Sequence, residues 1–154
     1  MIVRRAVASD KTRVIRLLKH SRDAAGFDSR EGLTGFTFPF DPAYAENLFL
    51  LHLEEAQNLC LVLNVENTVQ GVLMAASSPH PFGPVWLARE TVWWIEPAYR
   101  GTSAIRMLDQ YEQWARERGC DFIGMAGMGD DPDVSKLYQR RGFKIAETHF
   151  LKAV

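Results

Sequence analysis

Apolar residues recur at helical or strand spacing along most of the chain. Leu17 and Leu18 follow Val14 by three and four residues, with basic side chains between them. This spacing predicts a helix ending near residue 25. The same kind of spacing predicts further helices at residues 44–55, 101–118 and 132–141. Alternating or short continuous apolar runs, bounded by turn residues, predict strands at residues 2–6, 59–65, 69–76, 85–95, 121–128 and 143–151.

The predicted elements follow the order β-α-α-β-β-β-α-β-α-β along the chain. This order indicates an α/β fold in which helices pack on a single layer of sheet. A length of 154 residues suits one domain with one hydrophobic core. The chain has no internal repeat, linker or low-complexity stretch. We therefore expect one domain over residues 1–154.

Composition excludes several classes of protein. Hydrophobic residues make up 47% and charged residues 24%, which is ordinary for a soluble protein. The net charge of -1 gives no basic surplus for nucleic-acid phosphates. The longest apolar run, residues 59–63, is far too short to cross a bilayer, and the first 13 residues do not have the pattern of a signal peptide. Cys60 and Cys120 lack metal-site spacing and suggest a reducing, cytoplasmic environment.

The segment WWIEPAYRGTSAIRML, residues 93–108, has the pattern of a strand, a tight turn and a helix. Unpaired N–H groups at a helix start, together with the helix dipole, make an anion site. Gly101 lets a ligand approach the backbone closely, and Thr102 and Ser103 can add hydroxyl donors. Arg100 can neutralise phosphate charge. An ordinary strand-to-helix turn is the alternative, and the spacing alone leaves both interpretations open.

Two motifs together resemble one family. PAYRG (residues 97–101), placed between strand and helix, and LYQRRGF (residues 137–143) resemble the GNAT superfamily of acyl-CoA-dependent N-acyltransferases. The opening RRAVASDKTRVIRLL (residues 4–18) is similar to that family's first strand and helix. The resemblance covers nearly the whole chain in the same element order. It implies a single GNAT-like domain with a mixed, mostly antiparallel central sheet flanked by helices, and acetyl-CoA (coenzyme A) as co-substrate.

The resemblance implies that residues 100–105 hold the pyrophosphate of coenzyme A. The family's loop pattern is Arg/Gln-x-x-Gly-x-Gly/Ala, and here Ser103 and Ile105 replace its small residues. The resemblance further implies that backbone groups near Trp93 and Ile95 pair with the pantetheine arm. The implied cofactor-binding residues are Trp93, Ile95, Arg100, Gly101, Thr102, Ser103, Ala104 and Ile105.

Two residues are candidates for proton transfer. The resemblance implies that Tyr138 protonates the leaving thiolate, because phenol and thiol have comparable acidity. A core tyrosine with a satisfied hydroxyl is the alternative. Glu90 lies mid-strand with Trp86, Val92 and Trp94, where partial desolvation would raise its pKa and suit a general base. A structural ion pair with an arginine is the alternative for this glutamate.

Other polar residues give weaker signals. His80, between prolines in a loop, and Glu96 are weaker candidates for the base. The acidic run at residues 130–133 is better explained as a helix cap than as a metal site. Many GNAT members carry an asparagine at the Asp131 position, where it contacts the cofactor.

The Phe-rich segment, residues 27–42, joins the first two predicted helices. In GNAT proteins the acceptor lies under this connection, so the resemblance implies an apolar or aromatic acceptor pocket here. The candidate lining residues are Phe27, Phe36, Phe38 and Tyr44. Two alternatives stay open: the aromatic side chains cap the core, or they form a homodimer contact.

The leading hypothesis is an N-acetyltransferase that moves an acetyl group from acetyl-CoA to a primary amine of a small molecule or peptide by direct transfer. The second is a non-catalytic acyl-CoA-binding or interaction module of the same fold, motivated by Ser103 and Ile105. A nucleotide- or DNA-directed transferase is disfavoured by the nearly neutral charge.

Overall fold

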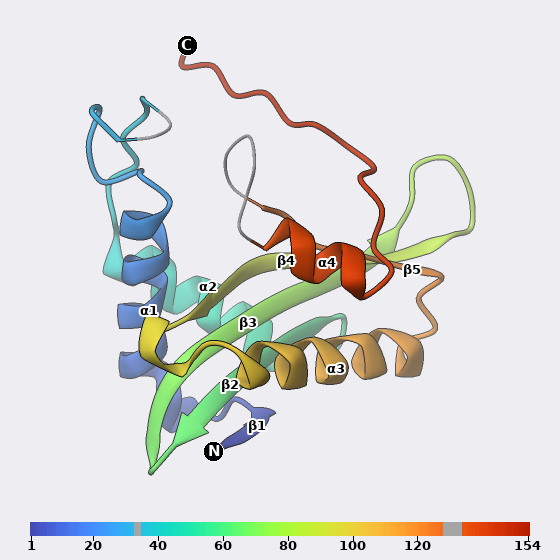
Figure 1. Cartoon of the computed structure of the whole chain (residues 1–154), viewed down its shortest axis with the longest axis horizontal. Coiled ribbons are helices and arrows are strands. Elements are labelled where there is room, and N and C mark those ends of the chain that lie inside the picture. Colours follow the sequence, from blue (N-terminus) through green and yellow to red (C-terminus); the bar gives the residue numbers. More distant parts are fainter. Residues whose placement is uncertain (33–34, 128–133) are drawn as a thin grey trace.

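The computed structural model describes residues 1–32, 35–127 and 134–154. They form a five-stranded sheet in the order β1-β2-β3-β4-β5, with helices on both faces (Figure 1). The strands are β1 (Ile2–Arg5), β2 (Asn58–Val65), β3 (Thr68–Pro79), β4 (Trp86–Ile95) and β5 (Phe122–Gly124). The helices are α1 (Lys11–Ala24), α2 (Pro42–Glu54), α3 (Thr102–Glu117) and α4 (Ser135–Arg140), with single 3-10 turns η1 (Ala8–Asp10) and η2 (Pro97–Tyr99).

The sheet is mostly antiparallel, as the resemblance implied. β1 to β4 pair with one another in chain order, and every one of these pairings is antiparallel. Glu66 and Asn67 form the predicted hairpin turn between β2 and β3, with φ angles of 47° and 64°. Only β5 runs parallel to its neighbour β4, and the long crossover through α3 makes that direction possible.

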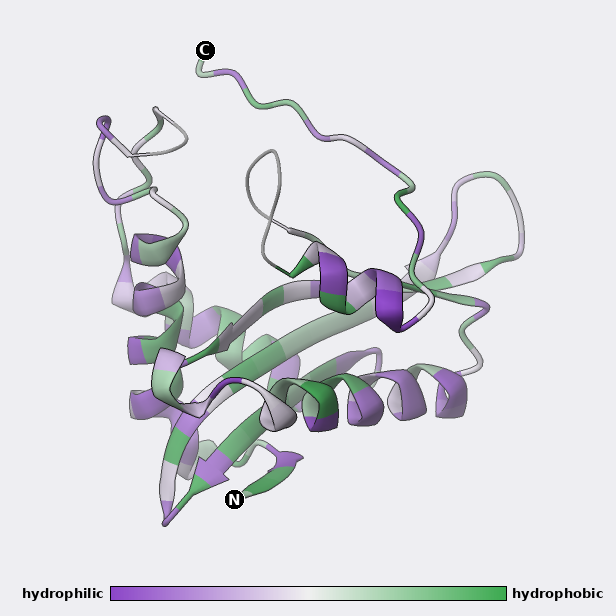
Figure 2. Cartoon of the chain, viewed as in Figure 1, coloured by the Kyte–Doolittle hydropathy of each residue, from purple (hydrophilic) through white to green (hydrophobic). Residues whose placement is uncertain are grey.

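The hydrophobic core has two layers, one on each face of the sheet. We name them by their helices: the α1–α2 layer and the α3–α4 layer. Figure 2 shows a predominantly hydrophobic β3 between them, whereas α3 carries both hydrophobic and hydrophilic residues along its length. Buried members of the α1–α2 layer include Val14, Leu17, Phe49, Cys60, Val62 and Met74. Buried members of the α3–α4 layer include Leu61, Leu73, Ala75, Met107, Tyr111 and Trp114, with Cys120 and Leu137 packed against them.

The ends of the helices follow local chemistry. The Asp41 side chain caps α2 by accepting hydrogen bonds from the N–H groups of Ala43 and Tyr44, and Pro42 takes the first helical position. α2 therefore begins before residue 44, where apolar spacing alone predicted it. Gly119, with a φ of 71°, follows α3 where a helix-ending glycine was expected.

The predictions for the C-terminal third are partly wrong. β5 covers only residues 122–124 of the predicted strand 121–128, and no strand forms in residues 143–154. This segment leaves α4 and runs away from the sheet (Figure 1), with Ile145 86% and Phe150 93% exposed. A strand needs a neighbouring edge as well as an apolar pattern, and β5 offers only a short one. Asp131 and the predicted start of the last helix lie outside the described residues.

None of the helices in the described part of the chain is long and apolar enough to span a membrane.

Candidate active site

β4 and β5 separate halfway along β4. Their parallel pairing runs from Leu87 opposite Phe122 to Arg89 opposite Gly124 and stops there. β4 continues to Ile95, and no described strand pairs with residues 90–95 on that side. The Glu96 N–H donates to β3 at 2.9 Å. Because backbone groups alternate in direction along a strand, those of Ile95 and Trp93 face the open edge.

A bulge in β4 decides which way its side chains face. Val92 lies opposite Met74 and Glu90 opposite Ala75, so Thr91 is an extra residue without a partner on β3. Val92 packs in the α1–α2 layer, and the Thr91 hydroxyl also reaches that side. Because the side chains of Thr91 and Val92 both lie on the α1–α2 side, the alternation is reversed before the bulge. The Glu90 side chain therefore lies on the α3–α4 side.

This placement corrects the sequence prediction for Glu90. Simple alternation predicts that Glu90 shares a face with Val92 and Trp94, both of which pack in the α1–α2 layer. Glu90 instead lies opposite Ala75, a member of the α3–α4 layer. The expected desolvation is nevertheless present, because burial on the α3–α4 side still raises the pKa of Glu90.

The Glu90 carboxylate bridges the point where the strands separate. It accepts a hydrogen bond from the N–H of Ala126 at 2.7 Å, just beyond the end of β5. Burial raises the pKa of Glu90 above its ordinary value, and the Ala126 hydrogen bond offsets part of that rise. Within the described residues Glu90 has no ion pair, so the alternative of an arginine partner has no support.

Tyr138 of α4 reaches the same residue from the other side. Its hydroxyl donates to the carbonyl oxygen of Ala126 at 3.0 Å. Burial raises the pKa of the Tyr138 phenol, and the charge of Glu90 raises it further. The ring centroids of Trp93 and Phe143 lie 6.2 and 5.7 Å from that of Tyr138. The phenol therefore keeps its proton at neutral pH beside a carboxylate that binds protons more readily than usual.

Ion pairs fix the short helix that carries Tyr138. Arg141, at the end of α4, bonds Glu112 at 2.8 Å and Asp109 at 2.5 Å on α3. Leu137 packs against the α3–α4 layer next to them. A helix of this length has little stability of its own, so these contacts set the position of the phenol.

The predicted phosphate loop adopts the expected turn. Gly101 has a φ of 91°, which a residue with a Cβ rarely adopts, and α3 begins directly after it. The N–H groups of Gly101, Thr102 and Ser103 have no acceptor in the described part of the chain, as expected at a helix start. The Ser103 side chain is buried and its hydroxyl donates to the Tyr99 carbonyl. Ser103 therefore offers only its N–H group, and the prediction of a hydroxyl donor was wrong there.

Arg100 lies against β4. Its Nε donates to the Ile95 carbonyl at 3.0 Å, and its guanidinium carbon lies 4.8 Å from the centre of the Trp94 ring. The arginine thus occupies one of the backbone groups on the open edge. Farther along the loop, Ala104 is partly buried and Ile105 is 41% exposed, so the isoleucine side chain points outward from the first turn of α3.

The two weaker base candidates lie in other surroundings. Glu96 accepts from His20 at 2.7 Å, Arg13 at 3.2 Å and Trp94 Nε1 at 3.3 Å. Burial alone would raise the pKa of Glu96, but these partners outweigh it and hold the pKa below its ordinary value. His80 lies in the loop after β3, where its Nδ1 accepts from the N–H of Phe82 at 3.2 Å. Neither group shares the environment of Glu90.

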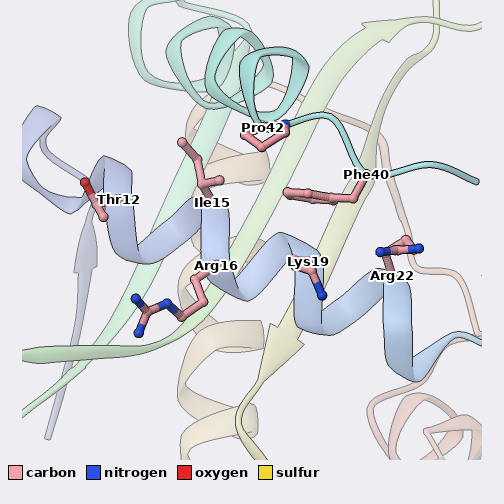
Figure 3. A pocket seen from close by; sticks show the side chains of 7 residues that line it. All are labelled: Thr12, Ile15, Arg16, Lys19, Arg22, Phe40 and Pro42. Carbon is pink, nitrogen blue, oxygen red and sulfur yellow. The ribbon is translucent and has the colours of Figure 1, made fainter. Parts of the chain in front are cut away.

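The Phe-rich segment is divided among different contacts. Phe27 and Phe38 stack on each other with centroids 4.4 Å apart, and Phe40 packs against the α1–α2 layer. Tyr44 is 71% exposed. Phe40 also lines an open groove along α1 (Figure 3). The groove is lined by Thr12, Ile15, Arg16, Lys19, Arg22, Phe40 and Pro42, none of which is a predicted site residue.

Comparison with known proteins identifies the family. The model of the acetyltransferase (GNAT) family matches residues 27–143, which include the phosphate loop, Glu90 and Tyr138. The chain belongs to the GNAT acetyltransferase family. No curated protein matches it.

Solved structures similar to this GNAT protein share its fold at low sequence identity. A transcriptional regulator from Bacillus halodurans C-125 is 18% identical with a TM-score of 0.76, covering 99% of each chain. A protein described as a predicted acetyltransferase with acetyl-CoA, from Clostridium acetobutylicum, is 17% identical with a TM-score of 0.74, covering 99% of this chain and 95% of that one. A ribosomal-protein-alanine N-acetyltransferase from Brucella melitensis biovar Abortus 2308 is 17% identical with a TM-score of 0.72, covering 100% of both.

Two elements of the candidate site escape sequence reasoning. Ala126 contributes only its backbone groups, and those leave no trace in residue type. Thr91 ends a run of three polar residues between two apolar stretches of β4, so no alternation marks it as the bulged residue.

Proposed function

We propose that this GNAT protein is an N-acetyltransferase that moves an acetyl group from acetyl-CoA to a primary amine by direct transfer. The observation that carries the proposal is the convergence of Glu90 and Tyr138 on Ala126, where β4 separates from β5. A carboxylate and a phenol at one point, both with raised pKa values, provide a proton acceptor and a proton donor. We also propose that residues 1–154 work as one acyltransferase domain.

Two features next to this point suit coenzyme A. The N–H groups of Gly101, Thr102 and Ser103 at the start of α3 can receive the pyrophosphate, with the helix dipole adding to the attraction. The open edge of β4 at Trp93 and Ile95 can pair with the amide groups of the pantetheine arm, as an added strand would. Arg100 must then release the Ile95 carbonyl, which frees its guanidinium for a phosphate. The similar structure from Clostridium acetobutylicum, described with acetyl-CoA, supports this choice of donor.

The proposed reaction needs two proton movements. The amine nitrogen attacks the thioester carbonyl carbon, a C–N bond forms and the C–S bond breaks. Glu90 takes the proton that the amine loses, directly or through water, and Tyr138 gives its proton to the leaving thiolate. Solvent then returns both side chains to their starting states. The products are the acetylated amine and coenzyme A thiol.

The acceptor is proposed only as a primary amine of a small molecule or peptide. The α1 groove is a poor site for it, because three cations, Arg16, Lys19 and Arg22, line the groove and would repel a protonated amine (Figure 3). The single carboxylate of Asp23, which pairs with Lys19 and Arg22, offsets only part of this charge. The Phe-rich segment between α1 and α2 stays the proposed acceptor side, with the exposed Tyr44 ring at its end.

One observation favours a second candidate, a non-catalytic acyl-CoA-binding module. Both proposed catalytic groups are engaged with Ala126, and Tyr138 must give up that hydrogen bond before its only hydroxyl proton can reach a thiolate. In a binding module the same contacts would simply hold α4 and β5 together.

Thermal unfolding with coenzyme A, followed by thiol release over a panel of primary amines, tests the proposal. At a coenzyme A concentration of about a hundred times Kd, the free energy of unfolding should rise by about 2.7 kcal/mol. Acetyl-CoA with a suitable amine should release thiol and give a product heavier by one acetyl group in mass spectrometry. Stabilisation without transfer to any amine would favour the binding module, and no stabilisation would refute both candidates.

A further inference from the structure

His52 is a buried polar side chain that the proposed reaction does not use. It lies on α2 and is 4% exposed. Its Nδ1 is 2.9 Å from the Leu48 carbonyl oxygen, and its Nε2 is 2.8 Å from the Thr91 hydroxyl. A polar group at such depth costs free energy unless both ring nitrogens have partners. These two contacts give His52 its full set.

The partners determine which nitrogen carries the hydrogen. A carbonyl oxygen can only accept, so the contact with Leu48 assigns the hydrogen to Nδ1. Burial lowers the pKa of His52, although the Leu48 carbonyl acts in the opposite direction, and the ring is therefore neutral near pH 7. Nε2 is then an acceptor, and the Thr91 hydroxyl must donate to it.

Thr91 is also the bulged residue of β4. A bulged residue loses regular ladder pairing, so another contact has to keep the strand in that register. Without the bulge, Glu90 would share a face with Val92 and point into the α1–α2 layer, where the buried side chains of the core cluster are apolar. The Thr91 hydroxyl ties the extra residue of the bulge to α2 through its hydrogen bond with His52.

We infer that the His52–Thr91 hydrogen bond holds the bulge in β4 and thereby keeps Glu90 on the α3–α4 side of the sheet. His52 and Thr91 are thus positioning residues for the proposed acetyl transfer, and this role rests on the proposed function. They act from the opposite face of the sheet, through the backbone of one strand, on a carboxylate that they do not touch.

Three substitutions separate the hydroxyl from the shape of the side chain. Thr91→Val removes the hydroxyl and keeps the branched side chain, whereas Thr91→Ser keeps the hydroxyl. Thr68→Val is the matched control, since it makes the same chemical change at an exposed position at the start of β3. Each variant is compared with the parent protein by thermal unfolding, so that loss of folding is recognised.

The first readout does not depend on activity. The pKa of Glu90 is measured by carbon NMR of the labelled carboxyl group, and the protection of the Ala126 amide by hydrogen exchange. With Thr91→Val we expect the pKa of Glu90 to fall toward its ordinary value and the Ala126 amide to exchange faster, because the carboxylate leaves that N–H. Thr91→Ser and Thr68→Val should leave both quantities as in the parent.

The second readout is the rate of acetyl transfer. Thr91→Val should lower kcat by about tenfold, the equivalent of one hydrogen bond, with little change in KM for acetyl-CoA. Thr91→Ser should restore the parent rate. His52→Leu should resemble Thr91→Val, and the double variant should be no worse than either single one, because both remove the same bond.

An unchanged pKa of Glu90 and unchanged exchange of Ala126 in Thr91→Val would overturn the inference, even if His52→Leu fails to fold. If the parent protein transfers acetyl to no amine, the proposed function fails instead. The NMR and exchange results would still decide whether the hydrogen bond positions Glu90.

Discussion

Glu90 and Tyr138 share one residue: the carboxylate of Glu90 accepts the Ala126 N–H at 2.7 Å, and the Tyr138 hydroxyl donates to the Ala126 carbonyl at 3.0 Å. The two side chains come from a strand and a helix far apart in the sequence. A single residue thus sets the spacing between the proposed base and the proposed acid. Any movement of Ala126 changes both contacts at once, so the two groups are coupled mechanically as well as by charge.

Replacing Tyr138 with phenylalanine tests the general acid. The ring and its packing against Trp93 and Phe143 remain, and only the hydroxyl is lost. We expect kcat to fall by about a hundredfold or more, with KM for acetyl-CoA nearly unchanged, because proton donation acts in the transition state. Thiol release at saturating acetyl-CoA measures it. An unchanged kcat in Tyr138→Phe would exclude the role.

The proposed base predicts a pH dependence. Glu90 accepts a proton only as a carboxylate, and burial raises its pKa above the ordinary glutamate value of about 4.3. The rate should therefore increase as pH rises through that raised pKa. Glu90→Gln should be slow at every pH and lack this limb. Since the acceptor amine also titrates, the decisive quantity is the ratio of kcat/KM for the parent and Glu90→Gln with one acceptor. A ratio that does not change with pH would rule out Glu90 as the base.

The same pKa shift predicts how stability changes with pH. The folded state binds a proton at Glu90 more tightly than the unfolded state does, so this contribution to stability is complete below the unfolded pKa of about 4.3. It is lost as pH rises through the folded pKa. Glu90→Gln has no such proton to lose, and its amide oxygen can still accept from Ala126.

Urea unfolding of both proteins at several pH values measures this difference. Relative to the parent, Glu90→Gln should gain about 1.4 kcal/mol of unfolding free energy for each unit by which the folded pKa is raised. The gain should vanish at acidic pH. The exposed Glu117→Gln on α3 serves as a control, and a gain that is independent of pH would contradict the burial of an ionisable Glu90.

Much of the fold could be predicted because long amphipathic elements determine it. Val14, Leu17 and Leu18 were assigned to the buried stripe of the first helix, and all three are buried. The order of the first nine predicted elements and the hairpin turn are confirmed. The prediction of a final strand at residues 143–151 was wrong. An apolar pattern shows which residues could pair, but it does not show whether the sheet offers a free edge for them. Ile145 and Phe150 consequently remain exposed.

The candidate site was predictable only where residue type carries the chemistry. Gly101 was expected at a turn that requires unusual backbone angles, and its φ of 91° agrees. The bulge at Thr91 could not be foreseen, because the polar run from Arg89 to Thr91 shows no alternation in which an extra residue would stand out. That single residue moves the Glu90 side chain to the other face of the sheet. A change of strand register by one residue can thus change which side chains form a site.

Gly101 supports a prediction about the phosphate loop. Its φ of 91° and ψ of -122° are strained for any residue with a Cβ, although a Cβ there would meet no atom within 4 Å. Gly101→Ala should therefore lower the free energy of unfolding by about 1–3 kcal/mol through backbone strain alone. Denaturant unfolding measures the loss. Gly83→Ala, also in open space and without a positive φ, should be nearly neutral, and equal effects of the two substitutions would refute the argument.

Each layer of the core carries one free thiol. Cys60 lies in the α1–α2 layer at 2% exposure, and Cys120 packs against the α3–α4 layer. Burial raises the pKa of Cys60 to about 12, so this thiol alkylates slowly unless its layer opens. Burial also raises the pKa of Cys120, which is partly exposed and alkylates at a rate that depends on the cover around it. The two labelling rates, separated by peptide mass, therefore report the protection of one thiol on each side of the sheet. A ligand that protects only one side of the sheet would slow the labelling of the cysteine on that side and leave the other labelling rate unchanged. The two native cysteines can therefore report on which side a substrate binds.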